Sequence, residues 1–120
     1  MQDKYLNRIT KLLEQVSPKL STKYRLEFKN VFGAVGGYVN GRIFISCGKF
    51  GVAVKLPPKI LESLLKERGV KRLKYFPKGH VKKEYAVLPK RILADKHQFK
   101  DLLKYSVDFV SSLPKWKKSR

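Results

Sequence analysis

Apolar and polar residues alternate along the chain with two different periods, and each period predicts a different element. In residues 3–16 the apolar side chains recur every three or four positions, which is typical of an amphipathic helix. These side chains are Tyr5, Leu6, Ile9, Leu12, Leu13 and Val16. Ser17-Pro18 ends this helix, because proline disfavours helical geometry at the residue before it. In residues 23–29 every second side chain is apolar, which predicts a half-buried strand.

Residues 31–56 contain six of the eight glycines and only three charged residues. Apolar runs of strand length alternate here with glycines, and Asn40-Gly41 lies between two such runs, which is a strong hairpin signal. The pattern predicts strands at 37–39, 42–46 and 51–56, with a turn at 48–51. We therefore expect a β-meander at the centre of a small sheet.

The second half of the chain returns to the helical period and then to short strands. Pro57-Pro58 opens a second helix, because proline suits the first helical turn. Strands are predicted at 73–76 and 81–88, followed by a helical turn at Ile92-Leu93. Asp95 with Gln98 three residues on resembles a capping box and predicts a last helix over about residues 96–113.

Strands that occur in runs, rather than in strict alternation with helices, predict an α+β fold. We expect a single antiparallel sheet flanked by helices, in the order α-β(3 to 4)-α-β(2)-α. A chain of 120 residues fits one domain, over residues 1–113, with a basic tail over 114–120. The chain contains no run of about 18 apolar residues, so no membrane span is predicted. The N-terminal residues do not resemble a secretory signal, so the cytoplasm is the expected compartment.

The charge of the chain changes this picture most. Lys and Arg number 28 against nine Asp and Glu, which gives a formal net charge of +19 and a pI near 10.2. A field of this sign favours anionic partners, namely nucleic acid, an acidic protein or an anionic membrane surface. The alternative is a lysine-rich surface that serves only solubility. Thermophilic proteins that use lysine in this way usually raise glutamate with it, and glutamate is scarce here.

The densest basic segment runs from residue 68 to residue 91 and contains one acid, Glu84. Its nine basic residues are Arg68, Lys71, Arg72, Lys74, Lys78, Lys82, Lys83, Lys90 and Arg91. Three aromatic residues, Tyr75, Phe76 and Tyr85, are interleaved with them. Basic and aromatic side chains together suit backbone contact with base stacking, so this segment is the predicted binding site for nucleic acid or another anionic partner. The alternative, aromatics in the core and lysines merely solvated, stays open. The tail, with Trp116 among lysines, is a second candidate.

Residues that carry catalysis or bind metals are few and scattered. The histidines, His80 and His97, lie in no recognisable motif, and a metal site needs three or four clustered ligands. Cys47 ends an apolar strand and is predicted to be a buried structural thiol. Arg42 and Lys49 nearby could lower its pKa, which leaves sensitivity to oxidation open. The sequence predicts a non-enzymatic protein without a metal or cofactor.

Several short motifs resemble the N-terminal domain of the TfoX/Sxy family of bacterial competence regulators. They are residues 31–44, Val52-Ala53-Val54-Lys55, Glu67-Arg68-Gly69, Tyr85-Ala86-Val87-Leu88-Pro89 and Ile92-Leu93 with Asp95. The resemblance covers about residues 3–113 and implies an α+β fold with helix, three strands, helix, two strands and helix. It also implies a cytoplasmic, non-enzymatic role in transcriptional control of DNA uptake. A stand-alone domain is expected, because nothing after residue 113 could form the second, helical domain of full-length regulators.

Charge and resemblance together predict a small regulatory or accessory protein that acts in transcription-related or nucleic-acid-associated processes through its basic surface. Two alternatives remain. One is an interaction adaptor for an acidic protein partner, without direct nucleic-acid binding. The other is an enzyme, which would need a concave pocket with converging polar groups.

Overall fold

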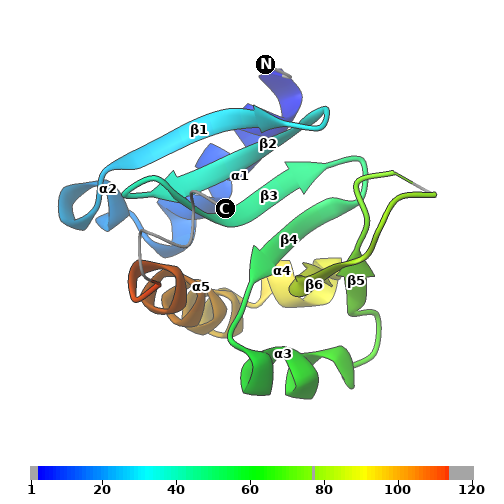
Figure 1. Cartoon of the computed structure of the whole chain (residues 1–120). Helices are drawn as coiled ribbons and strands as arrows, with labels where there is room; N and C mark the ends of the chain where they lie inside the picture. The colour runs from blue at the N-terminus through cyan, green and yellow to red at the C-terminus, as the bar shows by residue number, and fades with distance from the viewer. Residues whose placement is uncertain (1–2, 77, 114–120) are drawn as a thin grey trace.

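The computed structural model describes residues 3–76 and 78–113 (Figure 1). Its elements are α1 (Asp3–Val16), α2 (Leu20–Lys23), β1 (Leu26–Val31), β2 (Ala34–Val39), β3 (Arg42–Gly48), β4 (Gly51–Lys55), α3 (Pro58–Leu65), β5 (Lys71–Leu73), β6 (Lys82–Leu88), α4 (Lys90–Ala94) and α5 (Lys96–Ser111). The strands form one antiparallel sheet in the order β1-β2-β3-β4-β6-β5. This arrangement confirms the predicted α+β fold. Within the described ranges, no helix has the length and apolar character needed to cross a membrane.

Two-residue turns connect the first four strands. Asn40 and Gly41 have φ of +50° and +82°, and Phe32 and Gly33 have φ of +49° and +82°. Both pairs therefore have the positive φ values of a type I′ hairpin turn, whose twist matches that of the flanking strands. The Asn40-Gly41 hairpin is confirmed. The Phe32-Gly33 turn extends β2 back to Ala34, so this strand is longer than its predicted range of 37–39.

A β-bulge interrupts the pairing of β2 with β3. Gly37 pairs with Ile45 and Tyr38 pairs with Ile43, so Phe44 is the extra residue on β3. A bulged residue falls out of the ladder of backbone hydrogen bonds. Here the buried Ser106 hydroxyl of α5 donates to the Phe44 carbonyl at 3.0 Å. The bulge thus joins the sheet to the last helix.

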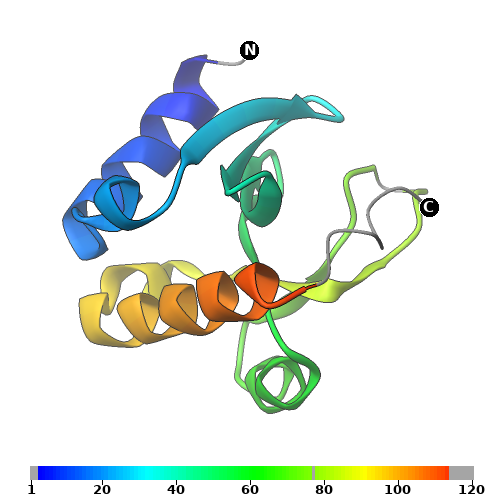
Figure 2. The same ribbon diagram turned by 60° about the vertical axis from the view of Figure 1, so that its left-hand side comes forward.

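Helices cover one face of the sheet. In Figure 2, α1, α4 and α5 lie together on one side, while residues 74–76 and 78–81, which we call the 74–81 loop, project on the other. The main core contains side chains from α1, α3, α4, α5 and the covered face, including Ile9, Leu13, Val35, Phe44, Ile45, Leu56, Leu64, Ile92, Phe99 and Leu103. No helix of the described residues packs on the second, smaller cluster, which is built on Ala53, Leu73 and Tyr85. We call this second side the helix-free face.

Some predicted boundaries differ from the structure. The strand predicted at 73–76 lies at Lys71–Leu73, because the chain leaves the sheet after Leu73 to form the 74–81 loop. Leu20–Lys23 forms a short helix that the alternating pattern did not predict. The last helix ends at Ser111 and begins as predicted, with Asp95 accepting a hydrogen bond from the Gln98 backbone N–H at 3.1 Å. The predicted basic tail, 114–120, lies outside the described residues.

Candidate functional site

One row of directly paired residues crosses all six strands on the helix-free face. In strand order it reads Lys29, Gly36, Ser46, Ala53, Val87 and Lys71. Residues directly opposite each other in a sheet share a face. The row therefore begins and ends with an exposed lysine, and its middle consists of small residues that leave room above the sheet.

Tyr75, from the 74–81 loop, occupies part of that room. Its hydroxyl donates to the Ser46 Oγ at 3.1 Å, and its ring packs edge-on against Phe50 at 5.5 Å between centroids. Burial raises the pKa of the Tyr75 phenol, and the hydrogen bond with Ser46 acts in the opposite direction. A loop that is distant in sequence is thus fixed to the centre of the sheet.

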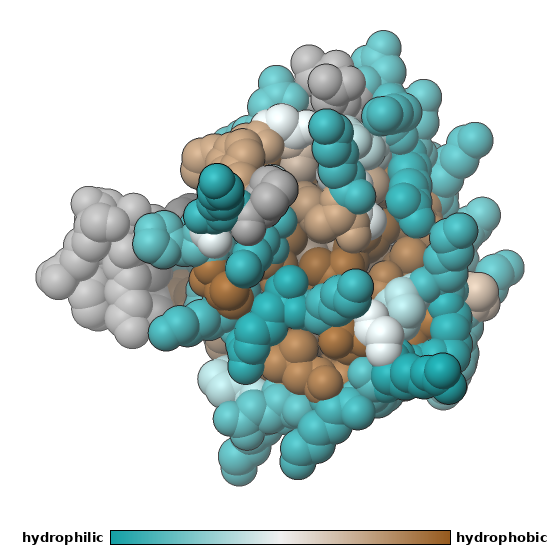
Figure 3. All heavy atoms as spheres, turned by 90° about the vertical axis from the view of Figure 1, so that its right-hand side faces the viewer, coloured by the Kyte–Doolittle hydropathy of each residue, from teal (hydrophilic) through white to brown (hydrophobic). Residues whose placement is uncertain are grey.

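Two exposed rings adjoin Tyr75. Phe32, in the β1–β2 turn, is 63% exposed, and its ring centroid lies 5.3 Å from that of Tyr75 and 5.9 Å from that of Phe76. Phe76 is 53% exposed. Viewed from the side where the 74–81 loop projects in Figure 1, apolar surface lies open among hydrophilic side chains (Figure 3).

Lys82 borders one of these rings, and Lys29 borders another ring, that of Tyr38. The Lys82 ammonium lies 5.8 Å from the centre of the Phe32 ring, and the Lys29 ammonium lies 5.0 Å from that of Tyr38. Both distances are within the range of a cation–π interaction. We call this surface the aromatic–lysine face. Its members are Phe32, Tyr75, Phe76, Lys29, Lys71 and Lys82.

The structure divides the nine predicted basic residues among three places. Lys71 and Lys82 belong to the aromatic–lysine face, and Lys74 and Lys78 are exposed in the adjoining loop. Neighbouring residues on a strand point to opposite faces. Accordingly, Arg72 lines a hollow with residues of α3 instead. Lys83 lines the same hollow, because the register shift between Arg72 and Leu73 breaks the regular alternation on β6. Arg72 donates to the Lys83 carbonyl at 3.5 Å.

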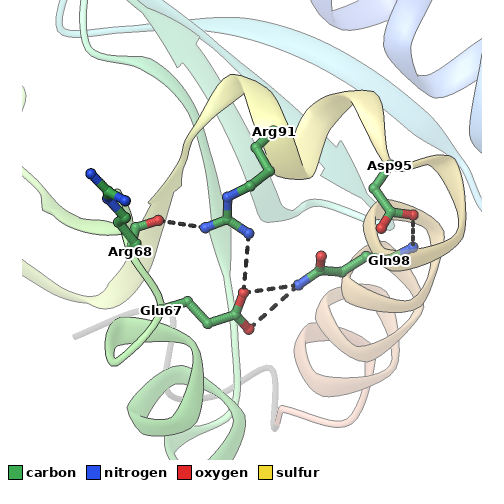
Figure 4. Close-up of polar contacts among 5 residues, drawn as sticks. All are labelled: Glu67, Arg68, Arg91, Asp95 and Gln98. Atoms are coloured by element: carbon green, nitrogen blue, oxygen red, sulfur yellow. Dashed lines mark hydrogen bonds and ion pairs between the residues drawn. The ribbon is translucent and has the colours of Figure 1, made fainter.

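The third place is the junction between α3 and α4 (Figure 4). Arg91 donates to the Arg68 carbonyl, and its guanidinium lies 3.6 Å from the Glu67 carboxylate. Gln98 also donates to Glu67, at 3.3 and 3.4 Å. The Arg91 side chain therefore holds two helices together, and its charge is partly neutralised by Glu67. Lys90 is exposed at the start of α4.

The three aromatic residues of the predicted segment also have different roles. Tyr85 is only 7% exposed and belongs to the helix-free cluster, where burial raises the pKa of its phenol. Tyr75 is half-buried, and Phe76 is exposed. Tyr85 is therefore a core residue, as the alternative interpretation of this segment proposed, whereas Phe76 is exposed at the surface, where it could contact a partner.

Phe32 and Lys29 were missed in the sequence. One signal could have found Phe32, because Phe32-Gly33 separates two apolar runs in the same way as Asn40-Gly41. A large aromatic residue at the tip of a two-residue turn has no core within reach.

Cys47 is fully buried, as predicted. Burial raises the pKa of its thiol, and Arg8 opposes this shift. The cation that lowers the Cys47 pKa is therefore Arg8, and not Arg42 or Lys49 as the sequence suggested. Arg42 instead donates to the Leu113 carbonyl at 2.6 Å.

We expect the Cys47 thiol to resist a water-soluble thiol reagent at pH 8 in the folded protein. The reason is that the thiolate is the reactive form, and burial disfavours it in addition to blocking access. The measurement compares the reaction rate in buffer with the rate in denaturing urea, where the thiol should react fully. Equal rates in the two solutions would contradict the buried placement.

A hollow of about 680 Å³ lies between α5 and the segment that joins α1 to α2. Its apolar wall includes Leu20, Leu103 and Val107, and neither histidine nor cysteine lines it. Its lysines and aspartates are all exposed. In the described part of the chain, no three His, Cys, Asp or Glu side chains gather as a metal site would require.

Comparison with known proteins agrees with the motifs. A search of the curated proteins finds no match. The family model described as the TfoX N-terminal domain matches residues 19–110, a span that contains all six strands and all six residues of the aromatic–lysine face. The chain belongs to the TfoX N-terminal domain family.

Proposed function

We propose that this protein is a non-enzymatic regulatory or accessory protein that binds nucleic acid through its aromatic–lysine face and the adjoining loop. Its membership of the TfoX N-terminal domain family supports the regulatory role. The net charge of +19 supports an anionic partner.

The exposed rings of Phe32 and Phe76, with the Lys82 ammonium over the Phe32 ring, carry the choice of surface. Its five lysines are all exposed, and within residues 3–76 and 78–113 none of them makes an ion pair. These lysines are Lys29, Lys71, Lys74, Lys78 and Lys82. Their charges are therefore available to phosphate groups, which dominate the affinity of proteins for nucleic acid.

The acids on β1 and β6, the strands that carry Lys29 and Lys82, are already paired with cations. Glu27, on β1, lies 3.3 Å from Arg25, and Glu84, on β6, lies 3.6 Å from Lys55. Both pairs are partly exposed and add little to stability. They do reduce the negative charge beside the five lysines, so the local field stays positive.

The proposal is tested by titrating salt against binding to duplex DNA, single-stranded DNA and RNA in parallel. Each phosphate that the protein neutralises should contribute about −0.9 to the log–log slope on duplex DNA and about −0.7 on single strands. No measurable binding to any of the three at about 50 mM salt would overturn the proposal.

Two matched variants locate the surface. The first replaces four lysines of the proposed surface by alanine. They are Lys71, Lys74, Lys78 and Lys82. The second replaces four exposed lysines of α3 and α5, which lie on the helix-covered side. They are Lys59, Lys96, Lys100 and Lys104. Each variant lowers the formal net charge by four, from +19 to +15. Only the first should weaken binding strongly and flatten the salt slope. Equal losses in both variants would show that charge alone acts, without this surface.

The purified chain also tests the main alternative, which is an adaptor for an acidic protein partner. If the purified chain binds no nucleic acid but recovers one protein in stoichiometric amount after nuclease treatment, the adaptor reading replaces this proposal. If nuclease treatment removes every partner, nucleic-acid binding is supported.

A further inference from the structure

Phe32 occupies a position that is unfavourable for phenylalanine in two respects. Its φ of +49° lies in the left-handed region, which bulky residues seldom adopt. Asn40, in the matching position of the next hairpin, is one of the residue types preferred there. Phe32 also leaves 63% of its surface in water. Neither feature helps the fold, and strained or exposed apolar residues of this kind cluster at functional sites.

Phe32 is part of a larger aromatic surface. Its ring contacts those of Tyr75 and Phe76, at 5.3 and 5.9 Å between centroids, although these residues lie more than forty positions away in the chain. Tyr75 is held in place by Ser46 below it and by Phe50 beside it. The exposed rings are thus supported by a residue that is fixed to the sheet, so binding would require little rearrangement.

Cations share the face that carries these rings. Lys82 lies against the Phe32 ring, and the paired row on the same face ends in Lys29 and Lys71. In the described residues none of the three makes an ion pair. Exposed aromatic faces beside unpaired lysines match the two needs of single-stranded nucleic acid, which are stacking for the bases and positive charge for the backbone.

We propose that the aromatic–lysine face is a stacking platform for unpaired bases of single-stranded nucleic acid, with Phe32 and Phe76 under the bases and Lys29, Lys71 and Lys82 along the phosphates. This inference rests on the proposed function and specifies its substrate class. A duplex keeps its base faces stacked inside, so it can satisfy the lysines but not the rings. Single strands expose the faces of their bases to aromatic side chains.

The first test compares affinities by fluorescence anisotropy at one salt concentration. The probes are labelled oligothymidylate, labelled oligouridylate and a labelled dA·dT duplex of the same length. Both single strands should bind more tightly than the duplex. Tighter binding of one single strand than of the other identifies DNA or RNA as the preferred backbone.

The second test removes the rings singly, by Phe32→Asn and Phe76→Ala. Each change should weaken single-strand binding by about 5- to 150-fold, the range found when one stacking side chain is replaced. Duplex binding should change little. Tyr105→Ala is the matched control, because Tyr105 is also an exposed aromatic residue, 46% exposed, but lies on α5. It should leave both affinities unchanged.

Phe32→Asn also separates binding from folding. Asparagine tolerates the left-handed φ better than phenylalanine, which offsets the loss of the ring contacts with Tyr75 and Phe76, so the variant should unfold at close to the temperature of the parent. Lower single-strand affinity with little change in thermal stability supports the platform.

Two outcomes overturn it while leaving the proposed function intact. In the first, the parent protein binds duplex at least as tightly as single strands. In the second, the two ring variants bind single strands like the parent. Absence of binding to all three probes overturns the proposed function itself.

Discussion

Replacing Phe44 by alanine is expected to lower the free energy of unfolding by about 3–5 kcal/mol. The side chain is fully buried in the main core. A methyl group on Gly37 would come within 3.5 Å of the Phe44 ring, so this ring packs directly against the neighbouring strand. A sheet braced by four helices collapses poorly into a cavity of that size. Since small domains are stable by only about 5–15 kcal/mol, the variant should be close to unfolding at physiological temperature.

Urea unfolding, followed by far-ultraviolet circular dichroism, measures the loss. Phe44→Leu keeps most of the buried volume and should lose clearly less. Tyr105→Ala removes an exposed aromatic residue from α5 and should stay within about 0.5 kcal/mol of the parent. A loss below about 1 kcal/mol for Phe44→Ala would contradict the packing described for the bulge.

The second large effect is expected at Ser106, by comparison with Ser111 on the same helix. Ser106→Ala removes the hydroxyl that donates to the Phe44 carbonyl at 3.0 Å. The bulged carbonyl would then be buried without this partner, and we expect a loss of about 1–3 kcal/mol. Ser111 has a buried hydroxyl with no hydrogen-bond partner among the described residues. Ser111→Ala should therefore be neutral or slightly stabilising.

The two serine variants differ by the same single oxygen from the parent, and alanine favours helix in both. Thermal unfolding of the pair at equal protein concentration compares them directly. Ser106→Ala should melt at the lower temperature. Equal melting temperatures would show that the bond between α5 and the bulge contributes nothing.

The features that the sequence predicted correctly depend on local chemistry. Asn40-Gly41 specifies a type I′ turn by itself, and Asp95 caps a helix through a backbone N–H only three residues away. The apolar run of strand length at 42–46 and the repeating apolar positions of 3–16 likewise need only patterns that are local in sequence. These signals were sufficient for the strand runs, the helices other than α2 and the α+β class.

What could not be predicted depends on pairing between distant segments. A register shift between Arg72 and Leu73 ends the regular part of β5 and releases the loop that carries Tyr75 and Phe76. The meeting of this loop with Phe32 requires all six strands to be in place. For the same reason the segment 68–91 resembled one site in the sequence, whereas the sheet separates Lys82 from Lys83 and the α3–α4 junction engages Arg91.

The order of the strands has a consequence for how the chain folds. β1, β2 and β3 pair only with their neighbours in sequence, and turns of two residues at 32–33, 40–41 and 49–50 connect the first four strands. Closing such short loops has a small entropic cost, and contacts that are near in sequence form fast. β4 pairs next with β6, across the α3 and β5 segment. We therefore expect the first four strands to assemble early, and the slow step of folding to be the arrival of β6. The two halves of the aromatic–lysine face would come together only in that last step.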